Sequence, residues 1–258
     1  MIHKKLAISG QIIESLDWTI FLQGGETLQP HIAQFQLKEP IEKGVHEVRF
    51  FASTDDSSAI QNFVGFAKTQ EQKDDRWILT CHSMASLAVQ RIPEGTNIRQ
   101  NLDSREYKKP AGVSLKEAFA EYSKTNHMNF VLPYSPAWGH YVNIKRQNII
   151  MDPRTGFDIG KQFEMRQPFW VELPTGELRF SDWPDGIHAE TEAMDMSRTG
   201  TFNEKRNEIT GQWVNGIWPG AMINNRKDSE GRPNAYYAKI IKITSDEKMK
   251  IFLKEVKL

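Results

Sequence analysis

Apolar residues gather in three short runs within the first 52 positions, and polar or turn-forming residues separate these runs. The runs are rich in β-branched and aromatic residues and are bounded by Gly or Pro, which is typical of strands. They cover Trp18–Leu22, Ile32–Leu37 and Val45–Phe51. This first part of the chain is therefore predicted to be β-rich.

The next two apolar segments have a pattern closer to that of helices. Ser58–Lys68 is predicted to be a short helix, although Gly65 weakens the pattern. Further along, Thr80 is a favourable N-cap for a helix that begins at Cys81, and Pro93 would end that helix. The helix that begins at Cys81 is expected to pack one apolar face against a sheet.

A third helix is predicted at Leu115–Lys124 by the residues at its N-terminus. Ser114 is a good N-cap, and Glu117, three residues later, completes a capping box. A strand is expected to begin near Asn129. From Phe169 onward many turn signals separate short apolar runs, and the chain closes with the strand-like segments AYYAKIIKIT and KIFLKEVKL.

The composition limits the classes of function. With 39% hydrophobic and 26% charged residues, the chain has enough apolar surface to bury a core, so disorder is not expected. The 33 basic and 33 acidic residues balance, so no general electrostatic attraction to nucleic acid is expected. The single cysteine excludes an internal disulfide and any zinc site built from several thiolates.

No stretch of the sequence approaches the roughly 20 continuous apolar residues that a membrane-spanning helix needs. The first residues also lack the apolar run of a secretory signal peptide. The protein is therefore expected to be cytoplasmic, or to be secreted without a cleaved signal peptide.

Thiol chemistry, if the protein uses it, must come from Cys81. A thiol in the first turn of a helix lies beside unpaired N–H groups and the positive end of the helix dipole, which lower its pKa. The same N–H groups could stabilise an oxyanion. The alternative is that Cys81 is a buried and unreactive packing residue, which is common for a free cysteine.

A histidine and an acid follow in a segment with the pattern of a hairpin. Its strands are predicted at His140–Ile144 and Ile149–Asp152. This register places His140 opposite or diagonal to Asp152, where the acid could orient the imidazole. The alternative is an ordinary hairpin whose Asp-Pro pair only forms the following turn.

The order of Cys81, His140 and Asp152, with the segment GHYVNIKRQNIIMDPRTG, resembles the papain-like superfamily and most of all its bacterial toxin and effector branch. The resemblance implies that Cys81 is the nucleophile, His140 the general base and Asp152 the orienting acid. It implies a protease, deamidase or amidase that attacks an amide bond through a thioester. Trp138 and Gly139 would then line the substrate cleft, while no glutamine matches the usual second oxyanion donor.

The predicted fold is α+β, with a papain-like core in which the Cys-bearing helix packs on an antiparallel sheet. The core would span residues 58–168, between a β-rich segment at 1–57 and a β-rich region at 169–258. The expected partner is a protein or peptide substrate, and no cofactor and no metal site are expected. Two alternatives stay open: a transglutaminase-like acyl transferase, and a non-catalytic binding or structural protein. In the second alternative the tryptophans of the C-terminal third, Trp183, Trp213 and Trp218, would form a binding surface or fill a core.

Overall fold

The structure is a computed structural model of the chain. It describes residues 3–53, 60–86, 105–126, 130–131, 145–151, 168–182, 194–195, 200–203, 206–214, 217–227 and 233–256. Within these residues the secondary structure is almost entirely antiparallel β-sheet, with a single full helix. The predicted α+β class with a papain-like core is therefore wrong.

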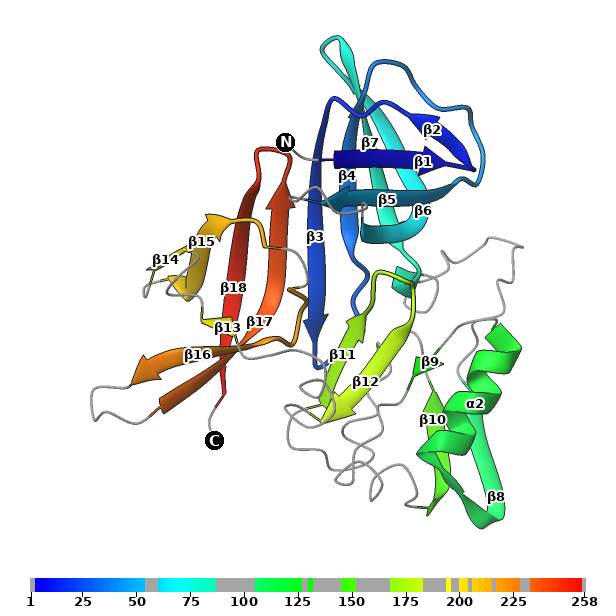
Figure 1. Ribbon diagram of the computed structural model, residues 1–258. Helices are drawn as coiled ribbons and strands as arrows, with labels where there is room; N and C mark the ends of the chain where they lie inside the picture. Colours follow the sequence, from blue (N-terminus) through cyan, green and yellow to red (C-terminus); the bar gives the residue numbers. More distant parts are fainter. Residues whose placement is uncertain are drawn as a thin grey trace.

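The N-terminal part forms one side of a long twisted sheet (Figure 1, blue to cyan). Its strands are β1 (His3–Ile8), β2 (Gln11–Ile13), β3 (Asp17–Gly25), β4 (Ile32–Leu37), β5 (Glu47–Ser53), β6 (Ile60–Lys73) and β7 (Arg76–Ser83). The three predicted strands correspond to β3, β4 and β5 and are confirmed. The predicted helix at Ser58–Lys68 is wrong, because β5 and β7 pair with both edges of β6 and draw Phe63 into the core.

The C-terminal part extends the same sheet (Figure 1, yellow to red). Its strands are β13 (Met194–Asp195), β14 (Gly200–Asn203), β15 (Glu208–Gln212), β16 (Met222–Lys227), β17 (Pro233–Thr244) and β18 (Lys248–Val256). The predicted closing pair of strands corresponds to β17 and β18 and is confirmed. Because β17 also pairs with β3, the two ends of the chain share one sheet, in the order β14-β15-β18-β17-β3-β4-β7-β6-β5-β1-β2. This path is called the main sheet below.

The middle of the chain contributes smaller elements beside the main sheet (Figure 1, green). They are β8 (Arg105–Ser114), α2 (Leu115–Asn126), β9 (Phe130–Val131), β10 (Lys145–Met151), β11 (Pro168–Glu172) and β12 (Leu178–Asp182). The predicted capping box is confirmed: Glu117 N–H donates to Ser114 Oγ at 3.2 Å, and Ser114 N–H donates to Glu117 Oε2 at 2.8 Å. Residues 145–148, which lie between the two strands predicted for the His140–Asp152 hairpin, are instead part of β10, which pairs with β8.

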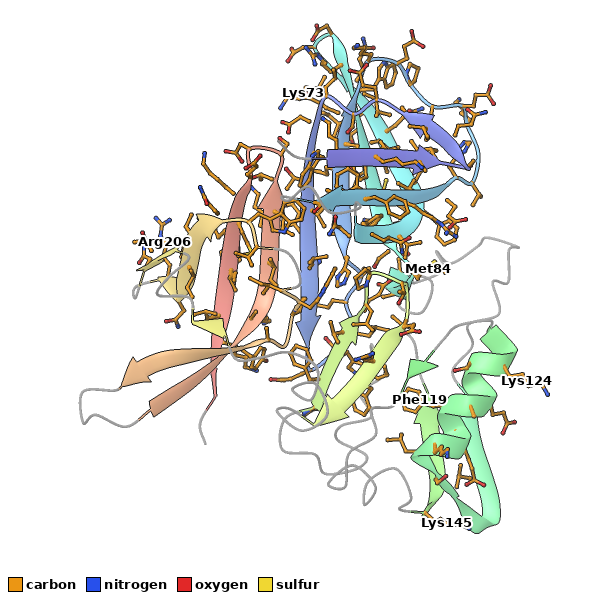
Figure 2. All side chains as sticks on the ribbon, viewed as in Figure 1. Lys73, Met84, Phe119, Lys124, Lys145 and Arg206 are labelled. Carbon is orange, nitrogen blue, oxygen red and sulfur yellow. The ribbon has the colours of Figure 1, made fainter. Side chains whose placement is uncertain are left out.

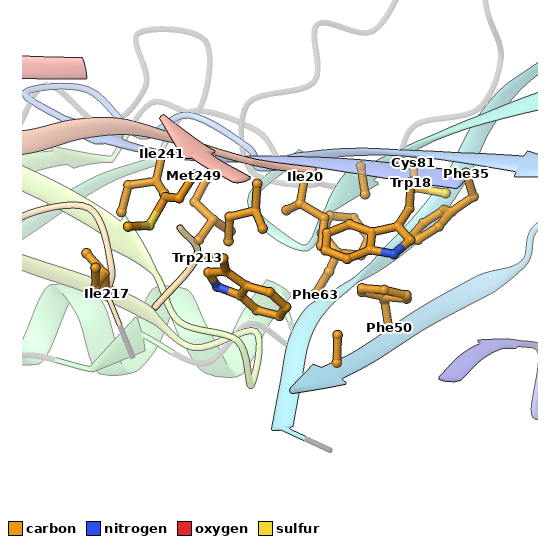
Figure 3. Close-up of a cluster of buried hydrophobic side chains, with 14 of the residues drawn as sticks. Trp18, Ile20, Phe35, Phe50, Phe63, Cys81, Trp213, Ile217, Ile241 and Met249 are labelled. Atoms are coloured by element: carbon orange, nitrogen blue, oxygen red, sulfur yellow. The ribbon is translucent and has the colours of Figure 1, made fainter. Parts of the chain in front are cut away.

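The main core lies on the inner side of the main sheet and joins its N-terminal and C-terminal strands. Trp18 is almost fully buried, and its ring contacts those of Phe50, at 4.9 Å between centroids, and Trp213, at 5.7 Å. Figure 3 shows these rings among the aliphatic side chains of the cluster. Trp213 therefore fills the core, and Trp218 packs partly against it, while Trp183 lies outside the described residues.

A second apolar cluster holds the β11–β12 hairpin and α2. Trp170 lies 4.4 Å from Phe180 and 5.7 Å from Phe119, measured between ring centroids. The hairpin joins the main sheet where Val171 pairs with Gly24 of β3. This approach requires a glycine, because a Cβ at position 24 would lie 2.8 Å from the Phe169 ring. β3, from the first predicted segment, thus pairs with residues of β11 and β17 from the third, and the domain boundaries stay a prediction.

Candidate functional site

The predicted nucleophile lies in a strand and not at the start of a helix. Cys81 belongs to β7, where it is opposite Ala33 of β4 and Ala67 of β6. Its side chain is fully buried in the main core, and Figure 3 shows it on the same side of the cluster as Trp18. Burial raises the pKa of the Cys81 thiol well above its usual value. The helix predicted from Cys81 is therefore wrong, and no helix dipole activates this thiol.

The other predicted site residues cannot be placed beside Cys81. His140, Asp152, Trp138 and Gly139 lie outside the described residues. Their roles as base, orienting acid and cleft lining stay sequence-based predictions. The described part of the chain also contains no group of three or more His, Cys, Asp or Glu side chains that could hold a metal ion.

The burial of Cys81 leads to a direct prediction. In the native protein, iodoacetamide is expected to alkylate Cys81 at least about 10²-fold more slowly than in urea, because reaction requires opening of the core. The measurement is the alkylation rate, followed by mass spectrometry in native buffer and in denaturant. A fast native reaction with a depressed pKa would contradict the buried position of this thiol.

The side of the main sheet opposite the core forms a broad polar surface, called the outer face here. Side chains alternate between the two sides of a strand, so the neighbours of core residues point outward. One row of paired outward residues crosses five adjacent strands without a charged group. It consists of Thr244, Thr19, Gln34, Thr80 and Thr69, on β17, β3, β4, β7 and β6.

A groove of about 830 Å³ runs along the outer face where the long β6–β7 hairpin lies beside β4. Gln34, Gln36 and Thr80 contribute amide and hydroxyl groups to its wall. Charged groups come from the hairpin tip, residues 71–76. Figure 2 shows Lys73 of this tip at one end of the molecule. Its lining, within the residues that the structure describes, includes no histidine or cysteine. The described lining of the groove thus offers polar groups that could bind a ligand, but it contains no cysteine or histidine that could act as a nucleophile or a base.

A buried polar cluster lies on the other side, where the β11–β12 hairpin meets the end of β7. The carboxylate of Glu172, only 1% exposed, accepts hydrogen bonds from three groups. Ser83 Oγ–H donates to Oε2, Met84 N–H to Oε1 at 2.8 Å, and Ala85 N–H to Oε2 at 3.1 Å. Figure 2 shows Met84 between the main sheet and this hairpin. Burial raises the pKa of Glu172 to about 7, although these three hydrogen bonds oppose the shift.

His31, which directly precedes β4, completes the cluster. Its Nδ1 accepts a hydrogen bond from Gln23 N–H at 2.9 Å, and its Nε2–H donates to the Glu172 carbonyl at 2.8 Å. Its own N–H donates to Ser83 Oγ at 2.7 Å. Burial lowers the pKa of His31 to about 4. The imidazole does not bond to the Ser83 hydroxyl, so the cluster is not a Ser-His-Glu catalytic triad.

Sequence reasoning missed both features for different reasons. The outer face has a signal in the sequence, because Gln34, Gln36 and Thr80 alternate with core residues along their strands. The buried cluster has no comparable signal, since Ser83 and Glu172 are 89 positions apart. Only the pairing of β11 with β3 brings Glu172 to the cluster.

The fold is similar to solved structures of tail and secretion proteins. The 43 kDa tail protein of prophage MuSo2 from Shewanella oneidensis aligns with a TM-score of 0.62 at 9% identity, over 98% of this chain and 96% of that chain. The tail protein from Neisseria meningitidis gives a TM-score of 0.62 at 11% identity, over 98% and 96%. The E. coli c3393 protein, a type VI secretion component structurally similar to T4 tail proteins gp27 and gp5, gives 0.58 at 10% identity, over 98% and 77%. No family model and no curated protein matches this chain.

These likenesses establish the fold, and they correct the predictions made from the sequence. The resemblance to papain-like cysteine hydrolases is wrong, because the similar folds are tail and secretion proteins over nearly the whole chain. The predicted cysteine-dependent hydrolase function is wrong with it, because that function was inferred from the papain-like resemblance. Among the described residues, no helix is long and apolar enough to cross a membrane. The chain thus has the fold of phage tail and type VI secretion proteins.

Proposed function

We propose that this chain is a non-catalytic structural component of a phage tail or a related secretion apparatus, in which it assembles with other protein chains. One observation carries the proposal: the likeness to tail proteins extends over 98% of the chain, so it includes both ends of the main sheet. The protein would accordingly be found with assembled tail-like particles and be released or secreted with them.

Two features of the molecule support a structural role. The main sheet joins strands from the start and the end of the chain around one core, which suits a rigid building block. Its outer face offers neutral hydrogen-bonding groups over five adjacent strands, which suits contact with other proteins. The buried Cys81 gives no support to a thiol reaction.

The test is whether the chain is incorporated into tail-like particles. An epitope-tagged copy is expressed in the source organism in place of the untagged copy, and tail-like particles are purified on a density gradient. The tagged chain is expected to sediment with the particles in a fixed ratio to the other tail proteins. Cys81→Ala is expected to be incorporated as well as the unchanged sequence, because the proposed role needs no thiol. Particles that form normally without the chain would overturn the proposal.

A further inference from the structure

We propose that one row of the outer face binds an amphipathic α-helix of a neighbouring protein, which has an apolar stripe along its length and acidic residues at one end. The row, called the lysine–aromatic band below, consists of paired residues on β18, β17, β3, β4, β7 and β6: Lys250, Lys242, Phe21, Ile32, His82 and Phe66. The inference deepens the proposed function and rests on it, because it assigns the chemistry of a contact through which the chain would assemble.

Most of the band is apolar, although it lies on the side of the sheet opposite the core. Phe21, Ile32 and Phe66 are each partly exposed. Burial, and after it the charge of Lys68, lowers the pKa of His82, so this ring is mostly neutral at pH 7. The band therefore has an uncharged stretch across four adjacent strands. Such a surface gains free energy when a partner removes it from water.

One end of the band carries positive charge. Lys242 and Lys250 are directly opposite one another, and like charges in this position repel. Glu208 is shared by Lys250 and Arg206, at 3.4 and 3.8 Å, so three cations accompany one carboxylate at this end. Within the described part of the chain no ion pair neutralises Lys242, whose Nζ lies 5.4 Å from the centroid of the Phe21 ring. A carboxylate of a partner beside Lys242 would offset the repulsion.

The pairing of the strands favours a helix as the partner element. Each of the six strands has a neighbour on both edges, and Figure 1 shows them side by side. A partner strand therefore finds no free edge there, and contact must come from side chains. A helix satisfies its own backbone hydrogen bonds and presents apolar side chains along one face. Six strands span about 24 Å at the usual strand spacing, which is the length of a helix of about 16 residues.

Polar groups border the band on the outer face. The neutral row of threonine and glutamine side chains lies two positions away along each strand, with Thr19 beside Phe21 and Thr80 beside His82. An apolar centre bounded by polar groups is typical of contacts between proteins. The helix α2 of the chain itself packs elsewhere, against β8, β9 and β10.

Lys242→Glu separates binding from folding. In the isolated chain the new carboxylate would lie opposite Lys250, so the urea midpoint is expected to stay equal or to rise. In tail-like particles it would meet the acidic end of the partner helix, so incorporation of the tagged chain is expected to fall at least about 10-fold. Lys5→Glu makes the same charge change at an exposed position of β1 outside the band. This matched control is expected to be incorporated normally.

Phe66→Thr tests the apolar part of the band without a change of charge. Threonine suits a strand, so β6 is expected to form, which the urea transition of the variant checks. Incorporation into particles is expected to fall at least about 10-fold, because the partner helix loses its contact at this end of the band.

A cross-linking measurement on the unchanged chain identifies the partner. A carbodiimide joins a lysine amine to a nearby carboxylate as an amide, and itself takes up the water that is lost. In purified particles it is expected to couple Lys242 to an Asp or Glu of another protein, in a segment whose apolar residues recur every three or four positions. Coupling of Lys250 to Glu208 within the chain is the internal control.

The possible failures are distinguishable. Normal incorporation of Lys242→Glu would overturn the inference and leave the proposed function intact. Cross-links from Lys242 only to a second copy of this chain, or to a segment without helical spacing, would also overturn it, because another occupant would cover the band. Absence of the unchanged chain from the particles would overturn the proposed function and the inference with it.

Discussion

Trp18→Ala is expected to lower the free energy of unfolding by about 3–5 kcal/mol, the usual cost of removing a large aromatic side chain from a core. Trp18 is 2% exposed and joins the N-terminal and C-terminal halves of the core through its contacts with Phe50 and Trp213. The loss is measured by urea denaturation, with the change in midpoint at constant slope as the readout.

Trp18→Phe separates the packing of the ring from its polar group. Trp18 Nε1 is buried without a hydrogen-bond partner among the described residues, so phenylalanine removes an unsatisfied donor while it keeps most of the apolar contact. The expected loss is below about 2 kcal/mol. Ile12→Ala, at a site 69% exposed, is the surface control and should change stability by less than about 0.5 kcal/mol. An equally small effect of Trp18→Ala would contradict the core described here.

Gly65→Ala is expected to cost at least about 3 kcal/mol, at the upper end of the usual cost of overpacking. A Cβ at position 65 would lie 2.1 Å from the carbonyl oxygen of His82, which is backbone and cannot rotate away. Accommodating it requires β6 and β7 to separate where Gly65 pairs with Ser83. The readout is the midpoint of thermal unfolding, together with the urea midpoint.

Gly25→Ala is the matched control, because it also introduces one methyl group in a strand of the main sheet. The nearest atom to its Cβ would be Lys239 Cε at 4.0 Å, which is an ordinary contact. Stability is expected to change by less than about 1 kcal/mol. If the two glycine variants lost equal stability, the close approach of β6 to β7 at Gly65 would be wrong.

The sequence predicted those elements whose signals are local. The residues from Ser114 to Glu117 contain the whole capping box, so the start of α2 follows from four positions. The strands at Ile32–Leu37 and in the closing pair were likewise recognisable from β-branched and aromatic residues bounded by turns. Such signals require no knowledge of distant parts of the chain.

The errors arose where distant partners decide the structure. The residues after Thr80 have acceptable helix propensity, but β4 and β6 pair with both edges of β7 and fix Cys81 in an extended segment. The supposed activation of the thiol depended on that local misassignment. The His31–Glu172 contact could not be predicted either, because 141 positions separate the two residues.

The pairing of β3 with β17 also sets the order of events during synthesis. Ile20 and Ile243 are opposite one another although about 220 residues separate them, an interval that a ribosome needs about 10–45 s to translate. During this time the edge of β3 that later receives β17 has no native partner. The core around Trp18 also lacks Trp213 until the last fifth of the chain emerges. The nascent protein thus depends on its final strands to close an edge that could pair with other chains.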